Sequence, residues 1–160
     1  MTISTGDKMP RGTFGLMTEA GPGAISTDEL FSGKKVVLVS VPGAFTPTCS
    51  AKHLPGYVEQ AVALQGKNVD TIACMAVNDV FVMDALGKDQ GVGDNVVMLA
   101  DGNGEYAEAL GLCFDGSGFG MGTRGQRFAI VVDDGVATHV AVEAPGQFEV
   151  SKAEAVLEAL

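Results

Sequence analysis

The amino-acid sequence predicts an α/β fold in which helices flank both faces of a mixed central sheet. Two observations lead to this prediction. Apolar runs of strand length, such as VVLVSV (36–41) and FAIVV (128–132), alternate along the chain with helical segments. No linker, repeat or low-complexity tract interrupts the 160 residues, so we expect one domain over 1–160 with a sizeable core.

The predicted elements follow in the order βαβαβα and then ββα. An opening stretch at 9–18 is compatible with a hairpin. Three strand patterns alternate with three helix patterns, at 34–41, 47–66, 69–77, 78–88, 96–100 and 104–111. A hairpin over 127–143 turns at Asp134-Gly135, and a helix over 151–160 closes the chain with Ser151 as its N-cap. This final ββα unit is typical of a thioredoxin-like fold.

Composition and charge exclude several classes of protein. The formal net charge of −10 opposes binding to nucleic acid or to an anionic membrane surface. No apolar run reaches the length of a membrane-spanning helix, and the N-terminus lacks the basic and apolar regions of a secretory signal. We therefore expect a cytoplasmic protein without nucleic acid or membrane partners.

The three cysteines, Cys49, Cys74 and Cys113, contain no CxxC pair. This absence disfavours a thiol-disulfide oxidoreductase with a vicinal dithiol and a zinc site built on paired cysteines. The only two histidines are His53 and His139, so we expect no metal site. Free thiols in a reducing compartment fit this pattern better than a disulfide framework.

The segment VPGAFTPTCSAKHLPG (41–56) leaves the carboxyl end of a predicted central strand and enters a helix, where α/β proteins bind ligands. Thr46 precedes Pro47, and the pair reads as N-cap and first helical residue. Cys49 then lies in the first turn, beside unpaired backbone N–H groups and the positive end of the helix dipole, which both favour the thiolate. The alternative is a buried, inert cysteine.

The pattern P-x-x-x-T-x-x-C, formed by Pro42, Thr46 and Cys49, resembles the active-site motif of the peroxiredoxins. The longer PGAFTPTCS-x-x-HLPG, with NDVFVM (78–83) and RFAIVV (127–132), resembles the type II, peroxiredoxin-5-like subfamily. The resemblance implies a thioredoxin-like fold, a homodimer, and a thiol peroxidase in which Cys49 is the peroxidatic cysteine. It implies hydrogen peroxide and alkyl hydroperoxides as substrates, without a metal or organic cofactor.

The chemistry of peroxide reduction accounts for the remaining residues of the motif. Sulfur attacks one oxygen in line, and charge that develops on both oxygens needs hydrogen-bond donors. Thr46 Oγ can accept from the peroxide while its own proton points to sulfur, and the N–H groups of Thr48 and Cys49 can hold the oxygens. Pro42 covers the thiolate. Arg127 matches the arginine of the family and supplies a fixed, forked cation.

Other residues have weaker assignments. Arg124 is the rival for the cationic role, but it does not directly precede the strand. The glycine-rich stretch 116–125 is expected to form a mobile wall of the peroxide pocket, with Phe119 and Met121 as its apolar lining. His53 follows Cys49 by one helical turn, so it either lowers the pKa of the thiol or lies at the rim of the site.

Recycling of the oxidised enzyme depends on a second thiol. The region 146–157 near the closing helix has no cysteine, Cys74 is expected to be buried, and Cys113 has no role in the resemblance. The sequence therefore favours a one-cysteine mechanism with external glutathione, with or without glutaredoxin. Pro55 is expected to weaken the helix and help expose Cys49. The alternatives are an atypical two-cysteine, thioredoxin-dependent peroxidase and a non-catalytic thioredoxin-fold binding module.

Overall fold

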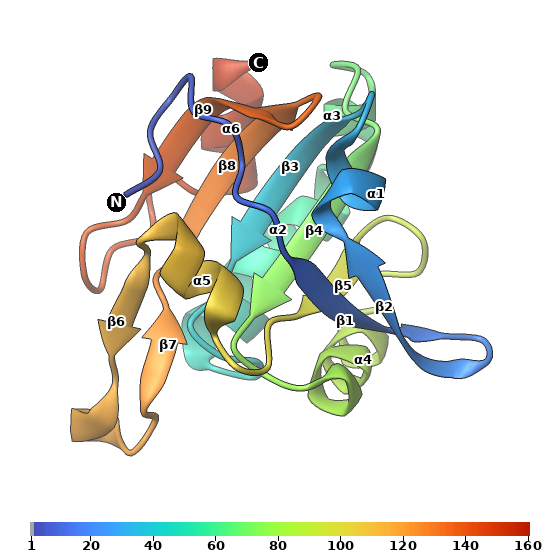
Figure 1. Ribbon diagram of the computed structural model, residues 1–160. Coiled ribbons are helices and arrows are strands. Elements are labelled where there is room, and N and C mark those ends of the chain that lie inside the picture. The colour runs from blue at the N-terminus through green and yellow to red at the C-terminus, as the bar shows by residue number, and fades with distance from the viewer. Residues whose placement is uncertain (1) are drawn as a thin grey trace.

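The computed structural model describes residues 2–160 and contains a seven-stranded mixed sheet in the order β2-β1-β5-β4-β3-β8-β9 (Figure 1). The strands β3 (Lys35–Ser40), β4 (Thr71–Ala76) and β5 (Val97–Ala100) are parallel. Two antiparallel pairs flank them, namely β8 (Phe128–Asp133) with β9 (Val136–Val142), and β1 (Thr13–Thr18) with β2 (Gly21–Ser26). The thioredoxin-like α/β fold is confirmed.

Side chains alternate between the two faces of the sheet along each central strand, and helices cover both faces, so both faces are buried. In β3, Val37 and Val39 contribute to one core layer, and Val36 and Leu38 to the other. The first layer also contains side chains of α2 (Leu54–Glu59), α3 (Ala61–Gln65), α4 (Val80–Asp89) and α6 (Ala153–Ala159). The second contains side chains of α1 (Thr27–Phe31) and α5 (Glu105–Leu110), which lie in front of the sheet in Figure 1.

The opening hairpin lies further along the chain than the predicted range 9–18. Its first strand, β1, falls wholly within that range, but its second strand is GPGAIS in β2. Glycine and proline disfavour strands, so this segment carries little sequence signal. Proline is tolerated there because β2 is the edge strand of the sheet.

The predicted helix over 47–66 is interrupted. Helical backbone begins at Pro47, but a π-helical turn spans Cys49–His53, and the chain breaks again at Gln60 between α2 and α3. Pro55 explains the first irregularity, because it has no N–H to donate to the carbonyl four residues earlier. The helix widens there, a rare feature that is often found at functional sites.

The closing unit matches the prediction in its hairpin and differs at its helix. Asp134 and Gly135 have positive φ values of 46° and 81°, as the expected tight turn requires. The helix α6 has Lys152 as its N-cap, so the prediction of Ser151 as the cap is wrong. The Ser151 hydroxyl instead donates to the buried carboxylate of Glu143 at 2.6 Å, which is a stronger acceptor for it.

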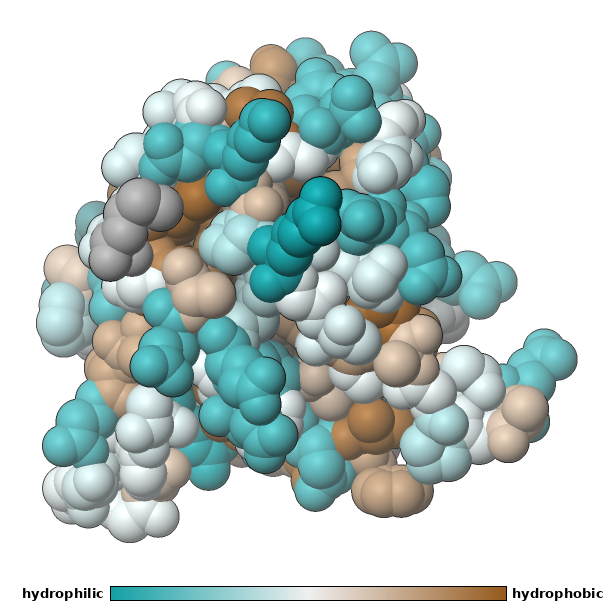
Figure 2. All heavy atoms as spheres, viewed as in Figure 1, coloured by the Kyte–Doolittle hydropathy of each residue, from teal (hydrophilic) through white to brown (hydrophobic). Residues whose placement is uncertain are grey.

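The glycine-rich stretch is part of a small hairpin that the sequence did not predict. Strands β6 (Cys113–Asp115) and β7 (Thr123–Gly125) pair with each other and extend away from the main sheet beside α5 (Figure 1). On the face seen in Figure 2, apolar side chains form separate small patches rather than one band. Within residues 2–160, no helix combines the length and apolar character needed to cross a bilayer.

Candidate active site

Cys49 lies where the sequence predicts it, at the start of the helical segment that follows β3. Its side chain is fully buried, at 0% exposure, in the core layer that also contains Val39 and Tyr57. The site is therefore built at the carboxyl end of a central parallel strand. Residues 42–46 form the loop between this strand and the helical segment that carries Cys49.

That loop is held in an unusual backbone conformation. Phe45 has a φ of 64°, in the left-handed region that bulky side chains rarely adopt. In this conformation, the backbone of Phe45 hydrogen-bonds Cys49. A second hydrogen bond joins the loop to the segment between β4 and α4, because the N–H of Ala44 donates to Oδ1 of Asn78 at 2.9 Å.

Thr46 lies on the same loop, but its hydroxyl proton does not point to the Cys49 sulfur as expected. Oγ1 of Thr46 donates to the carbonyl of Gly43 at 2.9 Å, so the proton points to this carbonyl and not to sulfur. The lone pairs of Oγ1 can still accept a hydrogen bond. Gly43 is closely packed, since a Cβ atom there would lie 3.0 Å from Nη1 of Arg124 and 3.2 Å from Cγ2 of Thr46.

Arg127 lies in the segment between β7 and β8, and its charge acts on Cys49. Burial raises the pKa of the Cys49 thiol above its ordinary value and is the largest effect. The charge of Arg127 and the hydrogen bond from Phe45 lower the pKa and oppose it. Burial therefore acts against Arg127 and Phe45 at this sulfur, and the preference for thiolate expected from the helix start stays a prediction.

His53 lies behind Arg127 and not at the rim. It is fully buried, and Nη1 of Arg127 donates to its Nδ1 at 2.8 Å. Since Nδ1 accepts, the ring proton is on Nε2, which donates to the carbonyl of Ser151 at 3.1 Å. Burial and the charge of Arg127 lower the pKa of His53 to about 3, so the ring is neutral at pH 7. A neutral ring carries no charge that could activate Cys49, and the expected contact of His53 with substrate stays a prediction.

A pocket of about 510 Å³ opens beside Arg127. Pro42 and Thr48, from the segment that leads into the Cys49 helix, line it, and their contact with peroxide stays a prediction. Phe119 also lines it, although its side chain is 84% exposed at the tip of the β6–β7 hairpin. The remaining lining residues come from the hairpin and from the segment after β9: Phe114, Gln126, Glu143, Ala144, Pro145, Gly146 and Gln147.

Met121 is on the same hairpin but is not part of this lining. Its carbonyl accepts a hydrogen bond from Nε of Arg124 at 2.9 Å. Its methyl carbon would lie 3.5 Å from a Cβ atom on Gly43, so Met121 packs against the Cys49 loop. Arg124 therefore links the hairpin to the loop, whereas Arg127 is the arginine whose charge acts on Cys49.

All three cysteines are free. Cys74 is fully buried in β4, as predicted, and burial together with the neighbouring Cys49 raises the pKa of its thiol. Cys113 is half-buried at the start of β6, where burial, Glu108 and Asp101 raise the pKa of its thiol. The charge of Arg127 also acts on Cys74, but neither Cys74 nor Cys113 lies at the start of a helix as Cys49 does.

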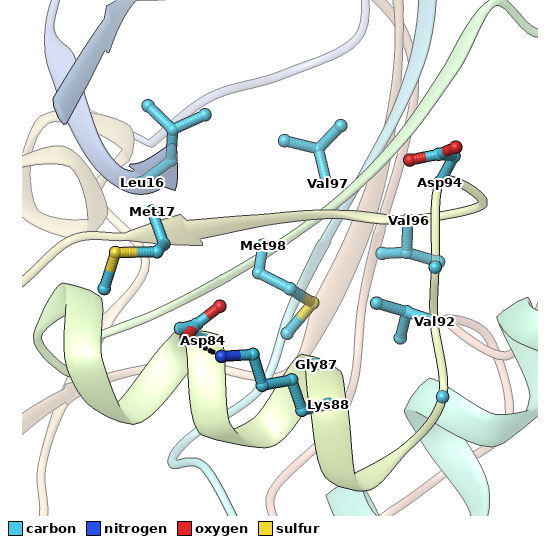
Figure 3. Close-up of a pocket in the computed structure, with 12 residues that line it drawn as sticks. Leu16, Met17, Asp84, Gly87, Lys88, Val92, Asp94, Val96, Val97 and Met98 are labelled. Carbon is cyan, nitrogen blue, oxygen red and sulfur yellow. Dashed lines mark ion pairs between the residues drawn. The ribbon is translucent and has the colours of Figure 1, made fainter. Parts of the chain in front are cut away.

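A second hollow, of about 380 Å³, lies between α4 and the strands β1 and β5. Figure 3 shows Met17 and Met98 reaching into it, with the Asp84–Lys88 ion pair on α4 at its border. It contains none of the residues that surround Cys49. Across residues 2–160, no three histidine, cysteine or acidic side chains are grouped as metal ligands.

Sequence reasoning missed the residues that support the site from a distance. Asn78 accepts from the Cys49 loop, and Tyr57 donates to the carbonyl of Ser151 at 2.6 Å. Oε2 of Glu143 accepts from the N–H and hydroxyl of Ser151. The one signal available was the spacing of His53 and Tyr57, which are four residues apart and so share a helix face.

The Redoxin family model matches residues 4–157, which covers almost the whole chain. Peroxiredoxin-2B of Arabidopsis thaliana is 47% identical over 159 residues, covering 99% of this chain and 98% of the relative. The chain is a type II peroxiredoxin.

Two solved structures are similar to this peroxiredoxin. Reduced Prx3 from Vibrio vulnificus in complex with hydrogen peroxide is 50% identical, with a TM-score of 0.95 and 99% coverage of both chains. The 1-Cys peroxiredoxin of Plasmodium falciparum is 30% identical, with a TM-score of 0.90 and 98% coverage of both. The protein is thus a thiol peroxidase that reduces peroxides.

Proposed function

We propose that Cys49 is the peroxidatic cysteine and that Arg127, Thr46 and Pro42 complete the reacting site. The observation that carries this proposal is the placement of a fully buried thiol at a helix start, with an arginine charge acting on it. Among the three cysteines, only this one has both features. The loop before it also supplies a hydrogen bond from the backbone of Phe45 to Cys49.

The proposed reaction conserves atoms and electrons at each step. The Cys49 thiolate attacks one peroxide oxygen, the O–O bond breaks, and the second oxygen leaves as hydroxide or alkoxide, which takes up a proton. Cys49 is thereby oxidised to the sulfenic acid. Arg127 stabilises the thiolate and the charge on the oxygens, and Oγ1 of Thr46 accepts from the peroxide hydrogen. Pro42 limits access of water, and the N–H of Thr48 is a donor to the oxygens.

Alkyl hydroperoxides are proposed as substrates together with hydrogen peroxide. The 510 Å³ pocket beside Arg127 supports this assignment, because Phe114, Phe119 and Pro145 give it apolar walls. An alkyl or aryl group of the substrate can pack against these walls while its O–O bond faces Cys49. Burial of such a group adds binding free energy that hydrogen peroxide cannot provide.

For recycling, we propose a one-cysteine mechanism with glutathione, assisted by glutaredoxin, in the cytoplasm. Glutathione condenses with the sulfenic acid to give a mixed disulfide and water, and a second thiol then releases Cys49 and forms a glutathione disulfide. Support comes from the buried position of Cys74 in β4 and from the half-buried position of Cys113 on the β6–β7 hairpin. A native disulfide needs Cα atoms within about 7 Å unless the backbone moves.

The direct test is mass analysis of the protein after one equivalent of hydrogen peroxide and then glutathione. We expect a glutathione adduct on Cys49 that glutaredoxin removes. Cys49→Ser should abolish peroxidase activity, while Cys74→Ser and Cys113→Ser should keep most of it. A disulfide between Cys49 and either of the other cysteines, reduced efficiently by thioredoxin, would instead support the atypical two-cysteine mechanism.

We also propose that the protein is a homodimer that packs through the surface around the Cys49 loop. Phe45 and Phe81 are 49% and 65% exposed, which is unusual for large apolar side chains. The hydrogen bond from Ala44 to Asn78 brings the segments that carry these two rings together. Phe81→Asp should convert the dimer to a monomer in sedimentation experiments. The matched variant Val62→Asp, at an exposed site on α3, should leave the dimer intact.

A further inference from the structure

Arg127 is held from behind by a chain of buried hydrogen bonds that ends in the segment before α6. Nη1 of Arg127 donates to Nδ1 of His53 at 2.8 Å, and Nε2 of His53 lies 3.1 Å from the carbonyl of Ser151. The carbonyl of Ser151 also accepts from the hydroxyl of Tyr57 at 2.6 Å. His53 and Ser151 are both fully buried, so water does not compete for these bonds.

Glu143 fixes the other side of Ser151. Its Oε2 accepts from the N–H of Ser151 at 2.8 Å, from the hydroxyl of Ser151 at 2.6 Å, and from the N–H of Glu149 at 2.8 Å. These hydrogen bonds lower the pKa of the Glu143 carboxyl, although burial acts in the opposite direction. The carboxylate therefore secures the backbone that presents the Ser151 carbonyl to His53.

We propose that His53 and Ser151 are positioning residues for Arg127, so that the reactivity of Cys49 depends on how the segment before α6 is seated. This inference rests on the proposed role of Arg127 at Cys49. The charged or titratable groups that act on Arg127 are Cys49, Glu143 and Cys74, and His53 contacts it directly.

The physical reason is the geometry of the guanidinium. Arginine is useful at a reacting centre only when its planar fork is aimed, and the side chain has several rotatable bonds. The hydrogen bond at Nη1 fixes one corner of the fork, because His53 is itself oriented by Ser151. His53 can accept at Nδ1 only while it is neutral, and its buried surroundings keep it so.

The test compares three variants by stopped-flow reaction with hydrogen peroxide and by the pH profile of Cys49 alkylation. His53→Leu removes both hydrogen bonds and should slow the peroxide reaction roughly 10- to 100-fold, a loss typical of a misplaced catalytic group. It should also move the alkylation midpoint to higher pH. His53→Asn keeps an acceptor oxygen near the position of Nδ1 and should recover much of the rate.

Tyr106→Phe is the matched control. It removes the hydroxyl of a buried tyrosine that donates to the carbonyl of Pro10 at 3.0 Å, in the core layer on the other face of the sheet. It should lower the Tm without changing the peroxide rate or the alkylation profile. A folded His53→Leu protein that keeps both properties of the wild type would reduce His53 to core packing and overturn the proposal.

Nitrogen NMR of the wild-type protein gives an independent readout that does not require a folded variant. The His53 ring should be the neutral Nε2–H tautomer from pH 5 to pH 8. A proton on Nδ1 would overturn the proposal. If Arg127→Lys reacts slowly with hydrogen peroxide while His53→Leu reacts at the wild-type rate, only the positioning role of His53 is refuted. Arg127→Lys at the wild-type rate would refute the role of Arg127 itself, and the inference with it.

Discussion

Oδ1 of Asn78 accepts a hydrogen bond from the N–H of Ala44 at 2.9 Å, and this bond joins the loop before Cys49 to the segment that follows β4. The neighbouring Phe45 has a φ of 64°, a conformation that costs on the order of 1–3 kcal/mol and persists only when its surroundings hold it. Because this conformation brings the backbone of Phe45 into a hydrogen bond with Cys49, Asn78 supports the site without touching the sulfur.

Asn78→Ala should therefore slow the reaction of Cys49 with hydrogen peroxide by about 10-fold, since displacing a reacting group by a fraction of an ångström has effects of this order. Stopped-flow oxidation measures the loss. Asn103→Ala is the control, because Asn103 is exposed in the turn before α5 and its amide donates to the exposed Glu105 side chain at 3.3 Å. Equal rates for the two variants would show that the loop holds its conformation without Asn78.

Substitution of Arg127 and of Arg124 should have clearly different effects on the rate of reaction with peroxide. Arg127→Lys keeps a charge but loses the forked donor and its bond to His53, so the peroxide rate should fall about 10²-fold, as for removal of one preorganised donor. Arg124→Lys should change the rate much less, because Arg124 bonds the carbonyl of Met121 on the hairpin. Stopped-flow oxidation of both variants decides, and the reverse ranking would assign the cationic role to Arg124.

Most of the fold could be predicted because its signals are local. The apolar run that became β3, the turn at Asp134-Gly135 and the order of strands and helices all depend on residues close in sequence. The errors have local causes as well. Pro55 distorts the helical turn that precedes it. The strands β6 and β7 have only three residues each and are joined by a glycine-rich segment, so the sequence gives no strand pattern there.

The site also contains residues that the sequence could predict and residues that it could not. Pro42, Thr46 and Cys49 lie within one short motif, so sequence reasoning could propose them. His53 was misplaced because its surroundings are set by Ser151, which is 98 positions away in the sequence. No periodicity or motif predicts that a helix residue will meet the segment before the last helix, and only the packed structure brings the two together.

Stability should decline in acid partly through His53. Its pKa is lowered to about 3 in the folded protein, whereas an unfolded histidine has a pKa of about 6.5. Between these values the unfolded chain binds the additional proton, so the free energy of unfolding falls by about 1.4 kcal/mol per pH unit as the pH decreases. Urea unfolding at several pH values measures this slope, and His53→Asn should make it shallower by that amount. An unchanged slope would mean that His53 titrates normally in the folded state.

The last prediction concerns access to the oxidised sulfur. Cys49 is fully buried, so a thiol as large as glutathione cannot reach it unless the turn Cys49–His53 opens. Pro55 favours opening, because it leaves the carbonyl of Ala51 without its usual helical donor.

Pro55→Ala restores that donor and should stiffen the turn. We expect the reaction with hydrogen peroxide to stay within about twofold of the wild type, since the folded site performs it, while formation of the glutathione adduct slows by about 10-fold, equivalent to about 1.4 kcal/mol. Rapid-quench mass analysis separates the two steps. Equal slowing of both steps would mean that the substitution distorts the folded site, and an unchanged glutathione step would show that the turn opens without help from Pro55.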